Sequence, residues 1–197
     1  MIKRFSSLTG TLVLGIVLCL SSAARAERTE EAQTFVAGNG DRMIAILDEP
    51  AGEERKQNFY VWLREVFDMD TLAGLALGPY RSTATPEQMA AYNDAFANYI
   101  VTTYHARFDA FTGYTFQVGQ AKELGNGDVA VRTTISDPAG KPIVVDFRVR
   151  PDGDSFKVID VVVEGLSMLK TQRDEFSSVI QRNGLDGLIN SLQQGSN

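Results

Sequence analysis

The stretch "VIDVVVEGLSMLKTQRDEF", residues 158–176, joins an apolar run to a charged one. Five branched apolar residues, interrupted by Asp160, have the composition of a buried strand. Glu164 and Gly165 end this run, and Gly165 allows the chain to turn because glycine has no Cβ. The residues from about 167 onward are typical of a helix. The stretch therefore predicts a strand that passes directly into a helix.

Three upstream segments alternate between apolar and polar residues with the period of two that a strand requires. They are 114–118, 129–135 and 143–149, and a fourth strand is expected over 156–163. Short turns connect them: "GNGD" at 125–128, "DPAGKP" at 137–142 and "PDGD" at 151–154. Four strands joined by such short turns predict an antiparallel meander.

Helical patterns lie before and after the strands. They cover residues 29–47, 53–67, 70–77, 85–111 and 167–193, with a break expected at Gly184. The clearest helix start is "TPEQ", in which Thr85 is the N-cap, Pro86 is the first helical residue and Gln88 completes a capping box. Helices segregated from strands indicate an α+β fold. We expect N-terminal helices, a four-stranded antiparallel curved sheet, and C-terminal helices packed on its concave face.

The N-terminus has the features of a secretory signal peptide. Lys3 and Arg4 precede an apolar stretch of 13 residues, Leu8–Leu20, whereas a membrane-spanning helix needs about 20. The sequence Ala24-Arg25-Ala26 then fits a cleavage site. Residues 1–26 are predicted to be a cleaved signal peptide, and residues 27–197 a single domain exported to the periplasm.

Composition excludes several functions for the processed chain. Removal of residues 1–26 takes away three basic residues, leaving 16 basic and 25 acidic residues and a net charge of −9. An acidic chain without basic clusters argues against nucleic-acid binding. The only cysteine, Cys19, leaves with the signal, and His105 is the only histidine, so neither cysteine nor multi-histidine metal sites are expected. We expect no cofactor and no metal.

Asp160 and Glu164 are the first candidates for a catalytic pair. Four residues along a strand separate them by about 13 Å, whereas glycosidase carboxylates lie about 5 to 9.5 Å apart. Ser167 lacks the second glycine of a nucleophile elbow. No catalytic motif remains, so the protein is not expected to be an enzyme. One alternative stays open, a small sheet-plus-helix enzyme with Asp160 as base; otherwise Asp160 is held by an arginine or by backbone donors.

Apolar side chains remain the main candidates for a site. The helix over 85–111 carries a stripe of them that includes Phe108, and the strands present branched residues on one face. A sheet under helices can enclose an apolar cavity for a small molecule. The predicted lining consists of Phe96, Ile100, Tyr104, Val145, Phe147, Val161 and Val163. If these residues only form a solid core, the protein is a cargo-free scaffold module.

Two stretches resemble the MlaC, or toluene-tolerance, family. The first is "LALGPYRSTATPEQMAAYNDAF", residues 75–96, and the second is "FKVIDVVVEGLSMLKTQRDEFSSVIQRNGLDGLI", residues 156–189. The second carries the family's C-terminal signature at Val163, Glu164, Gly165, Ser167, Arg173, Phe176, Gly184, Gly187, Leu188 and Ile189. A hopanoid-associated branch of the family is similar as well.

The resemblance implies a soluble periplasmic carrier of glycerophospholipid. Such a carrier shuttles between an outer-membrane lipoprotein complex and an inner-membrane ABC transporter with an MCE-domain subunit, and maintains outer-membrane lipid asymmetry. The acyl chains would lie inside the protein and the head group near its surface. Shielding two chains of about thirty methylenes from water requires roughly 24 kcal/mol, at about 0.8 kcal/mol each, which favours a deep apolar pocket.

Overall fold

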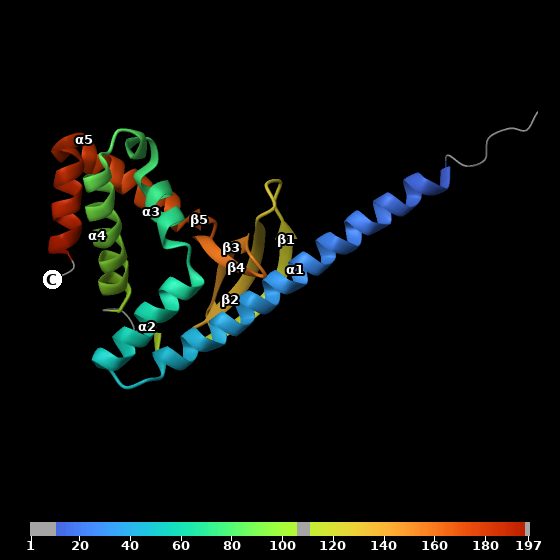
Figure 1. Ribbon diagram of the computed structural model, residues 1–197. Helices are drawn as coiled ribbons and strands as arrows, with labels where there is room; N and C mark the ends of the chain where they lie inside the picture. Colours follow the sequence, from blue (N-terminus) through green and yellow to red (C-terminus); the bar gives the residue numbers. More distant parts are fainter. Residues whose placement is uncertain (1–10, 106–110, 196–197) are drawn as a thin grey trace, which may run out of the picture.

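The computed structural model describes residues 11–105 and 111–195, with side chains described from residue 25 onward (Figure 1). Phe108 and the side chain of His105 lie outside this description. Helices come first, the strands follow, and a long helix ends the chain. This order confirms the α+β class. The first helices are α1 (Thr11–Leu47), α2 (Glu53–Val66), α3 (Met69–Leu77), the 3-10 turn η1 (Gly78–Ser82) and α4 (Pro86–His105).

The start of α4 is the capping box that the sequence predicts. The backbone N–H of Gln88 donates to Oγ1 of Thr85 at 3.2 Å, and the backbone N–H of Thr85 donates to Oε1 of Gln88 at 3.1 Å. Asp68 caps α3 in a similar way, since its carboxylate accepts from the N–H of Thr71 at 3.0 Å. Each cap satisfies donors that have no partner within the helix.

Helix α1 begins earlier than expected, at Thr11 rather than near residue 29, and the predicted cleavage point after Ala26 lies within it. Figure 1 shows its first half extending away from the rest of the molecule. Cleavage itself remains a prediction. Within the described residues, no helix combines the length and apolar character needed to cross a membrane.

The sheet has five antiparallel strands rather than four, in the order β1-β2-β3-β4-β5. The fifth has only two residues, too few for alternation to reveal, and pairs with the end of the fourth after a tight turn at Glu164 and Gly165. The strands are β1 (Thr115–Glu123), β2 (Val129–Ser136), β3 (Pro142–Asp152), β4 (Ser155–Val163) and β5 (Leu166–Ser167). Helix α5 (Met168–Gln194) follows directly.

A bulge in β4 decides which side chains face the core. Arg148 pairs with Asp160 while Val149 pairs with Val158, so Ile159 is an extra residue in β4. The extra residue shifts the alternation by one position. As a result Val158 and Val161, three residues apart, both contact the same group of buried side chains.

Helix α1 forms the main cover of the sheet: it packs along β1 and reaches β2 and β4. A Cβ on Gly40 would meet Cε1 of Phe116 at a distance below any normal contact, so only glycine lets the ring pack against the helix backbone. Helix α5 packs mainly against α3 and α4 and meets the sheet only at β4 and β5. This differs from the expected arrangement, because the apolar side chains of α5 are buried against other helices.

Candidate functional site

Most of the buried apolar side chains among the described residues form two separate groups. We call the first the sheet cluster; it lies between the sheet, α1 and α2, with one residue from α4. Its buried members are Ala32, Val36, Ile46, Leu47, Phe59, Trp62, Leu63, Val66, Val101, Val129, Val131, Val149, Phe156 and Val158. The second, the helix cluster, lies between α3, α4 and α5 and contains Ala73, Ala76, Leu77, Tyr92, Ala95, Phe96, Phe176, Ile180, Leu188, Ile189 and Leu192. Two half-buried residues, Met69 and Ile100, pack against both clusters. They mark a seam between two apolar layers.

The four predicted lining residues on the sheet are direct neighbours. Val145 pairs with Val163 across β3 and β4, and Phe147 pairs with Val161. Phe147 and Val161 pack against the sheet cluster, and the ring of Phe147 lies edge-on to that of Phe116 at 6.1 Å between centroids. These residues therefore form one continuous apolar area on β3 and β4.

The three predicted lining residues on α4 lie in different surroundings. Phe96 belongs to the helix cluster, where its ring meets Phe176 edge-on at 6.2 Å. Ile100 lies at the seam, one turn further along the helix. Tyr104 is 42% exposed. Helix α4 thus runs from the helix cluster to the sheet cluster, and Ile100 is the one predicted α4 residue that contacts both.

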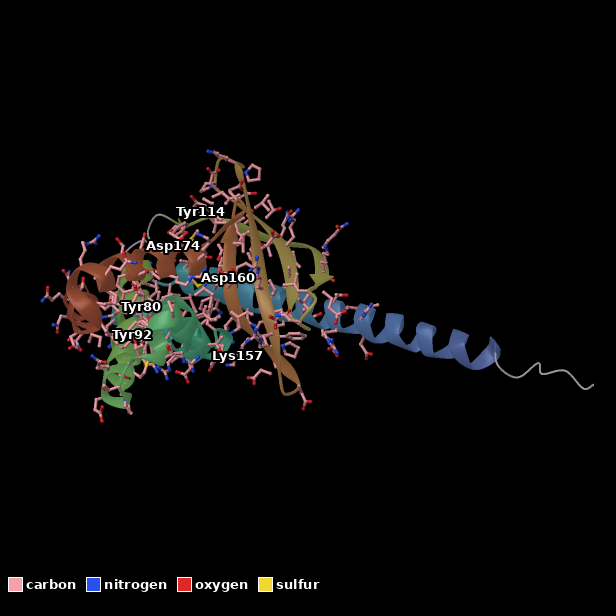
Figure 2. All side chains as sticks on the ribbon, turned by 90° about the horizontal axis from the view of Figure 1, so that it is seen from above. Tyr80, Tyr92, Tyr114, Lys157, Asp160 and Asp174 are labelled. Atoms are coloured by element: carbon pink, nitrogen blue, oxygen red, sulfur yellow. The ribbon has the colours of Figure 1, made fainter. Side chains whose placement is uncertain are left out.

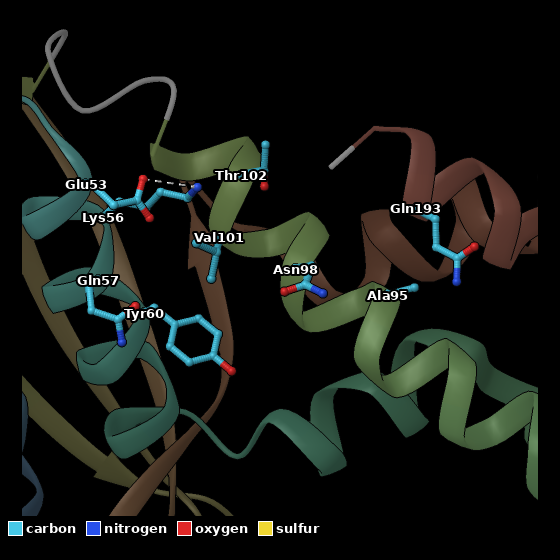
Figure 3. A pocket seen from close by; sticks show the side chains of 9 residues that line it. All are labelled: Glu53, Lys56, Gln57, Tyr60, Ala95, Asn98, Val101, Thr102 and Gln193. Atoms are coloured by element: carbon cyan, nitrogen blue, oxygen red, sulfur yellow. Dashed lines mark ion pairs between the residues drawn. The ribbon is translucent and has the colours of Figure 1, made fainter. Parts of the chain in front are cut away.

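A hollow of about 420 Å³ lies between α2, α4 and the end of α5 (Figure 3). Its lining has two kinds of residue: Ala95 and Val101 are buried and apolar, whereas the others are polar or aromatic and surround them. Helix α2 contributes Glu53, Lys56, Gln57 and Tyr60; α4 contributes Ala95, Asn98, Val101 and Thr102; α5 contributes Gln193. Because Val101 belongs to the sheet cluster and Ala95 to the helix cluster, the hollow opens beside the seam.

None of the seven predicted lining residues lines this hollow, although Phe96 and Ile100 are sequence neighbours of Ala95 and Val101. The sequence did not predict that residues of α2 line the hollow, because the predicted lining was chosen by apolar periodicity alone. A mixed polar and aromatic helix face has no period that distinguishes it from a solvated surface. Tyr60, placed next to the buried Phe59, was the one available signal.

A second hollow of about 440 Å³ lies between α1 and the end of β1. Its lining includes Glu123, Arg25 and Ala26. The predicted cleavage after Ala26 would remove Arg25 and Ala26 from the protein. Arg25 and Arg28 both form ion pairs with Glu123, at 3.1 and 2.7 Å. Because cleavage would remove part of its lining, this second hollow would not have the same shape in the processed protein.

Asp160 lies where the sheet meets α5, and its carboxylate is fully engaged (Figure 2). Its Oδ2 accepts from the hydroxyl of Ser167 at 2.7 Å and lies 3.4 Å from Nη1 of Arg148, and its Oδ1 accepts from the N–H of Leu169 at 3.2 Å. The residue is 3% exposed. The interpretation that an arginine and backbone donors hold Asp160 is therefore confirmed, and the site is a helix cap.

Glu164 holds the neighbouring turn. Its Oε1 accepts from the N–H of Val144 at 2.6 Å, and its own N–H donates to the carbonyl of Val144 at 2.9 Å. Its φ of 49° places it in the left-handed region, which few residues other than glycine adopt. Arg148 is the base that supports this corner, through Asp160, whereas the side chain of Arg173 lies close to Gly78.

The face of the sheet that is turned away from the sheet cluster, a face to which Arg148 and Asp160 also belong, carries arginine–aspartate pairs. Arg150 donates to both carboxylate oxygens of Asp128, at 2.8 and 3.0 Å, and Arg132 does the same to Asp146 at the same distances. These guanidinium groups hold the pKa of each aspartate below its ordinary value, against the opposing effect of burial. Among the described residues, no group of His, Cys, Asp and Glu side chains could hold a metal ion.

Known proteins with similar sequences and folds point to one family. The sequence model of the MlaC protein family matches residues 38–194. The intermembrane phospholipid transport system binding protein MlaC of Haemophilus influenzae is 29% identical over 124 residues, which are 61% of this chain and 58% of that protein. The toluene tolerance protein ttg2D of Pseudomonas putida is 28% identical over 107 residues, which are 54% of this chain and 50% of that protein. The alignments thus span only about half of these relatives.

A solved structure extends the likeness to nearly the whole fold. The phospholipid-binding protein of Ralstonia solanacearum, determined in complex with a phospholipid, superposes with a TM-score of 0.74 at 26% sequence identity. The match covers 84% of this chain and 97% of that protein. With a family model that spans four fifths of its sequence and a fold shared with a phospholipid-binding protein, this chain belongs to the MlaC family.

Proposed function

We propose that this protein is a periplasmic carrier that binds one glycerophospholipid and moves it between the outer and inner membranes. The observation that carries the proposal is the shared fold with the Ralstonia protein, which was determined with a phospholipid bound and is matched over 97% of its length. The predicted signal peptide supports the periplasmic location. Family membership supports the transport role.

The acyl chains would lie along the seam between the two clusters. A methylene is about the size of a water molecule, whose share of the liquid is about 30 Å³, so a hollow of about 420 Å³ accommodates about 14 methylenes. That is about one acyl chain. A second chain requires the clusters to separate at Ile100 and Met69, where each layer presents apolar side chains to the other.

The residues proposed to line the widened pocket come from both sides of the seam. Phe96, Ile100 and Tyr104 lie on α4, and the area formed by Val145, Phe147, Val161 and Val163 lies on β3 and β4. Separation of two packed apolar layers costs free energy, and the lipid chains offset that cost by restoring apolar contact at about 0.8 kcal/mol per methylene. The empty protein is then closed and the loaded one wider.

A lipid carrier between two membranes implies partner proteins at both of them. A carrier that releases lipid needs a membrane receptor on each side, and we propose an outer-membrane lipoprotein complex and an inner-membrane MCE/ABC transporter. The Haemophilus relative, described as the binding protein of an intermembrane phospholipid transport system, supports this assignment. The role would be to maintain the lipid asymmetry of the outer membrane.

The two alternatives make different predictions. An enzyme with Asp160 as base would need a carboxylate able to accept a substrate proton, yet both of its oxygens already accept hydrogen bonds in a buried corner. A cargo-free scaffold would retain no lipid at all. The carrier proposal is therefore the one that we test.

The test is extraction of the protein after purification without detergent. Mass spectrometry of the organic extract should show about one diacyl lipid per protein molecule, and it would also separate phospholipid from hopanoid-related cargo. A control extract from an unrelated exported protein, purified in the same way, sets the background. Lipid at background level, with no uptake from added vesicles, would reject the carrier proposal in favour of a scaffold.

A further inference from the structure

Among the residues that the structure describes around the hollow between α2 and α4, the charges cancel. The charged lining residues in this described part of the chain are Glu53 and Lys56, whose side chains lie 3.7 Å apart on the first turn of α2. The remaining polar lining side chains are uncharged, namely Gln57, Tyr60, Asn98, Thr102 and Gln193. A site built for an anion would instead collect an excess of cations, as phosphate sites do.

The Glu53–Lys56 pair is weakly held. The side chain of Glu53 is 83% exposed and that of Lys56 is 41% exposed, and exposed pairs of this kind contribute little to stability. Asp128 and Asp146 differ from Glu53, since each accepts two hydrogen bonds from one arginine. A ligand can therefore separate Glu53 from Lys56 at small cost and bind each of them.

The uncharged donors surround the same space (Figure 3). Tyr60 on α2 and Asn98 on α4 point into the space between the two helices, and Gln57 and Thr102 line the same hollow. The phenol of Tyr60 accepts from Nη1 of Arg64 at 3.2 Å, and a phenol that accepts in this way still has its own proton to donate. Amide and hydroxyl donors of this kind bind phosphate oxygens without adding charge.

We propose that this rim is a head-group site selective for zwitterionic phospholipids, in which the phosphate binds Lys56 and the amide donors while the ammonium, two methylenes away, binds Glu53. The inference rests on the carrier function proposed above and adds the class of head group. An anionic head group without the ammonium would gain Lys56 but would face Glu53 unpaired. The general acidity of the chain adds to that repulsion.

The experiment is a competition between two lipids with identical acyl chains. Delipidated protein is loaded from vesicles that contain equal amounts of phosphatidylethanolamine and phosphatidylglycerol, and the bound lipids are extracted and quantified. We expect about a two- to fivefold preference for phosphatidylethanolamine, the size expected of one exposed ion pair. Glu53→Lys should reverse the preference, so that phosphatidylglycerol becomes the major bound lipid.

The matched control is Glu54→Lys. Glu54 is the next residue of α2, is exposed and does not line the hollow, and its substitution changes the net charge by the same amount. It should keep the wild-type preference. Equal binding of both lipids by the wild type, or the same shift in both variants, would overturn the head-group site while the carrier function stands. Failure to load either lipid would overturn both proposals.

Discussion

The hydroxyl of Ser167 donates a hydrogen bond of 2.7 Å to the carboxylate of Asp160, and so joins the first turn of α5 to the last long strand of the sheet. Ser167 is also the N-cap of α5, since its Oγ accepts from the N–H of Lys170 at 3.0 Å. One serine and one aspartate therefore hold the corner at which the chain leaves the sheet cluster for the helix cluster. This corner sets where α5 begins, and the far end of α5, beyond the kink at Gly184, contributes Gln193 to the hollow.

Asp160→Asn should lower the free energy of unfolding by about 1 to 3 kcal/mol, because it removes a buried charge-assisted acceptor and leaves Arg148 without its partner. Urea denaturation measures the change. Asp154→Asn, in the exposed turn between β3 and β4, is the control and should have almost no effect. If Asp160→Asn were as stable as the wild type but lost an enzymatic activity that the wild type has, the result would instead support an enzyme with Asp160 as base.

Two glycine substitutions should have opposite effects on stability. Gly184 has φ 72° and ψ 174° at the kink of α5, a conformation that side chains disfavour, and Gly184→Ala should cost about 1 to 3 kcal/mol. Gly38 lies in the interior of α1, and Gly38→Ala should stabilise the protein by about 1 kcal/mol.

A Cβ would meet nothing within 4 Å at either glycine, so backbone conformation alone sets the sign. Thermal denaturation of both variants, measured against the wild type, provides the comparison. A gain in stability from Gly184→Ala would show that the kink is not fixed in solution.

Acid should destabilise the protein through Asp128 and Asp146. Their arginine partners lower the pKa of both carboxylates in the folded state, so the unfolded chain binds protons more readily. The resulting stability is fully present above the unfolded pKa of about 3.9 and is lost as the pH falls through the lower folded values.

Urea denaturation between pH 7 and pH 3 should therefore show a decline that begins near pH 4. Asp128→Asn should be less stable than the wild type at neutral pH and should lose less on acidification. Asp154→Asn serves again as the control and should retain the wild-type pH dependence. A decline in Asp128→Asn as steep as that of the wild type would mean that the Arg150 pair contributes nothing to it.

Filling the hollow should reduce lipid uptake. Thr102 is half-buried and lines the hollow, so the ring of Thr102→Phe should occupy space proposed for the bound lipid. Thr103→Phe, at the next residue of α4, is equally half-buried but does not line the hollow. Lipid bound per protein, measured by extraction after vesicle loading, should fall several-fold in the first variant only. Equal loading of both would place the acyl chains elsewhere.

Much of the local structure could be predicted from the sequence. The capping box of Thr85 and Gln88, the hairpin turns and the break at Gly184 all depend on interactions within a few residues. The bulge at Ile159 could not be predicted in this way, because an extra residue becomes apparent only against the pairing of the adjacent strand. The same holds for β5, whose two residues are a strand only because β4 lies beside them.

The residues of the candidate site also divide into those that the sequence could predict and those that it could not. Apolar pattern was sufficient to select Val145, Phe147, Val161 and Val163, which the structure places side by side. It could not select Lys56 or Tyr60, since a polar residue that lines a hollow has the same local sequence as one on an open surface. Their role depends on where α4 lies relative to α2, and long-range packing sets that position.

The sequence by itself determined the α+β class, the order of the elements and the resemblance to the MlaC family, because caps, turns and periodicity act over short distances along the chain. Only the tertiary structure decided that α1 covers the sheet, that the apolar residues divide into two clusters, and that a hollow lies beside the seam between them. These features arise where elements distant in sequence exclude water together. Asp160 belongs to both levels: its place in a strand could be predicted, but its burial under α5 as a cap could not.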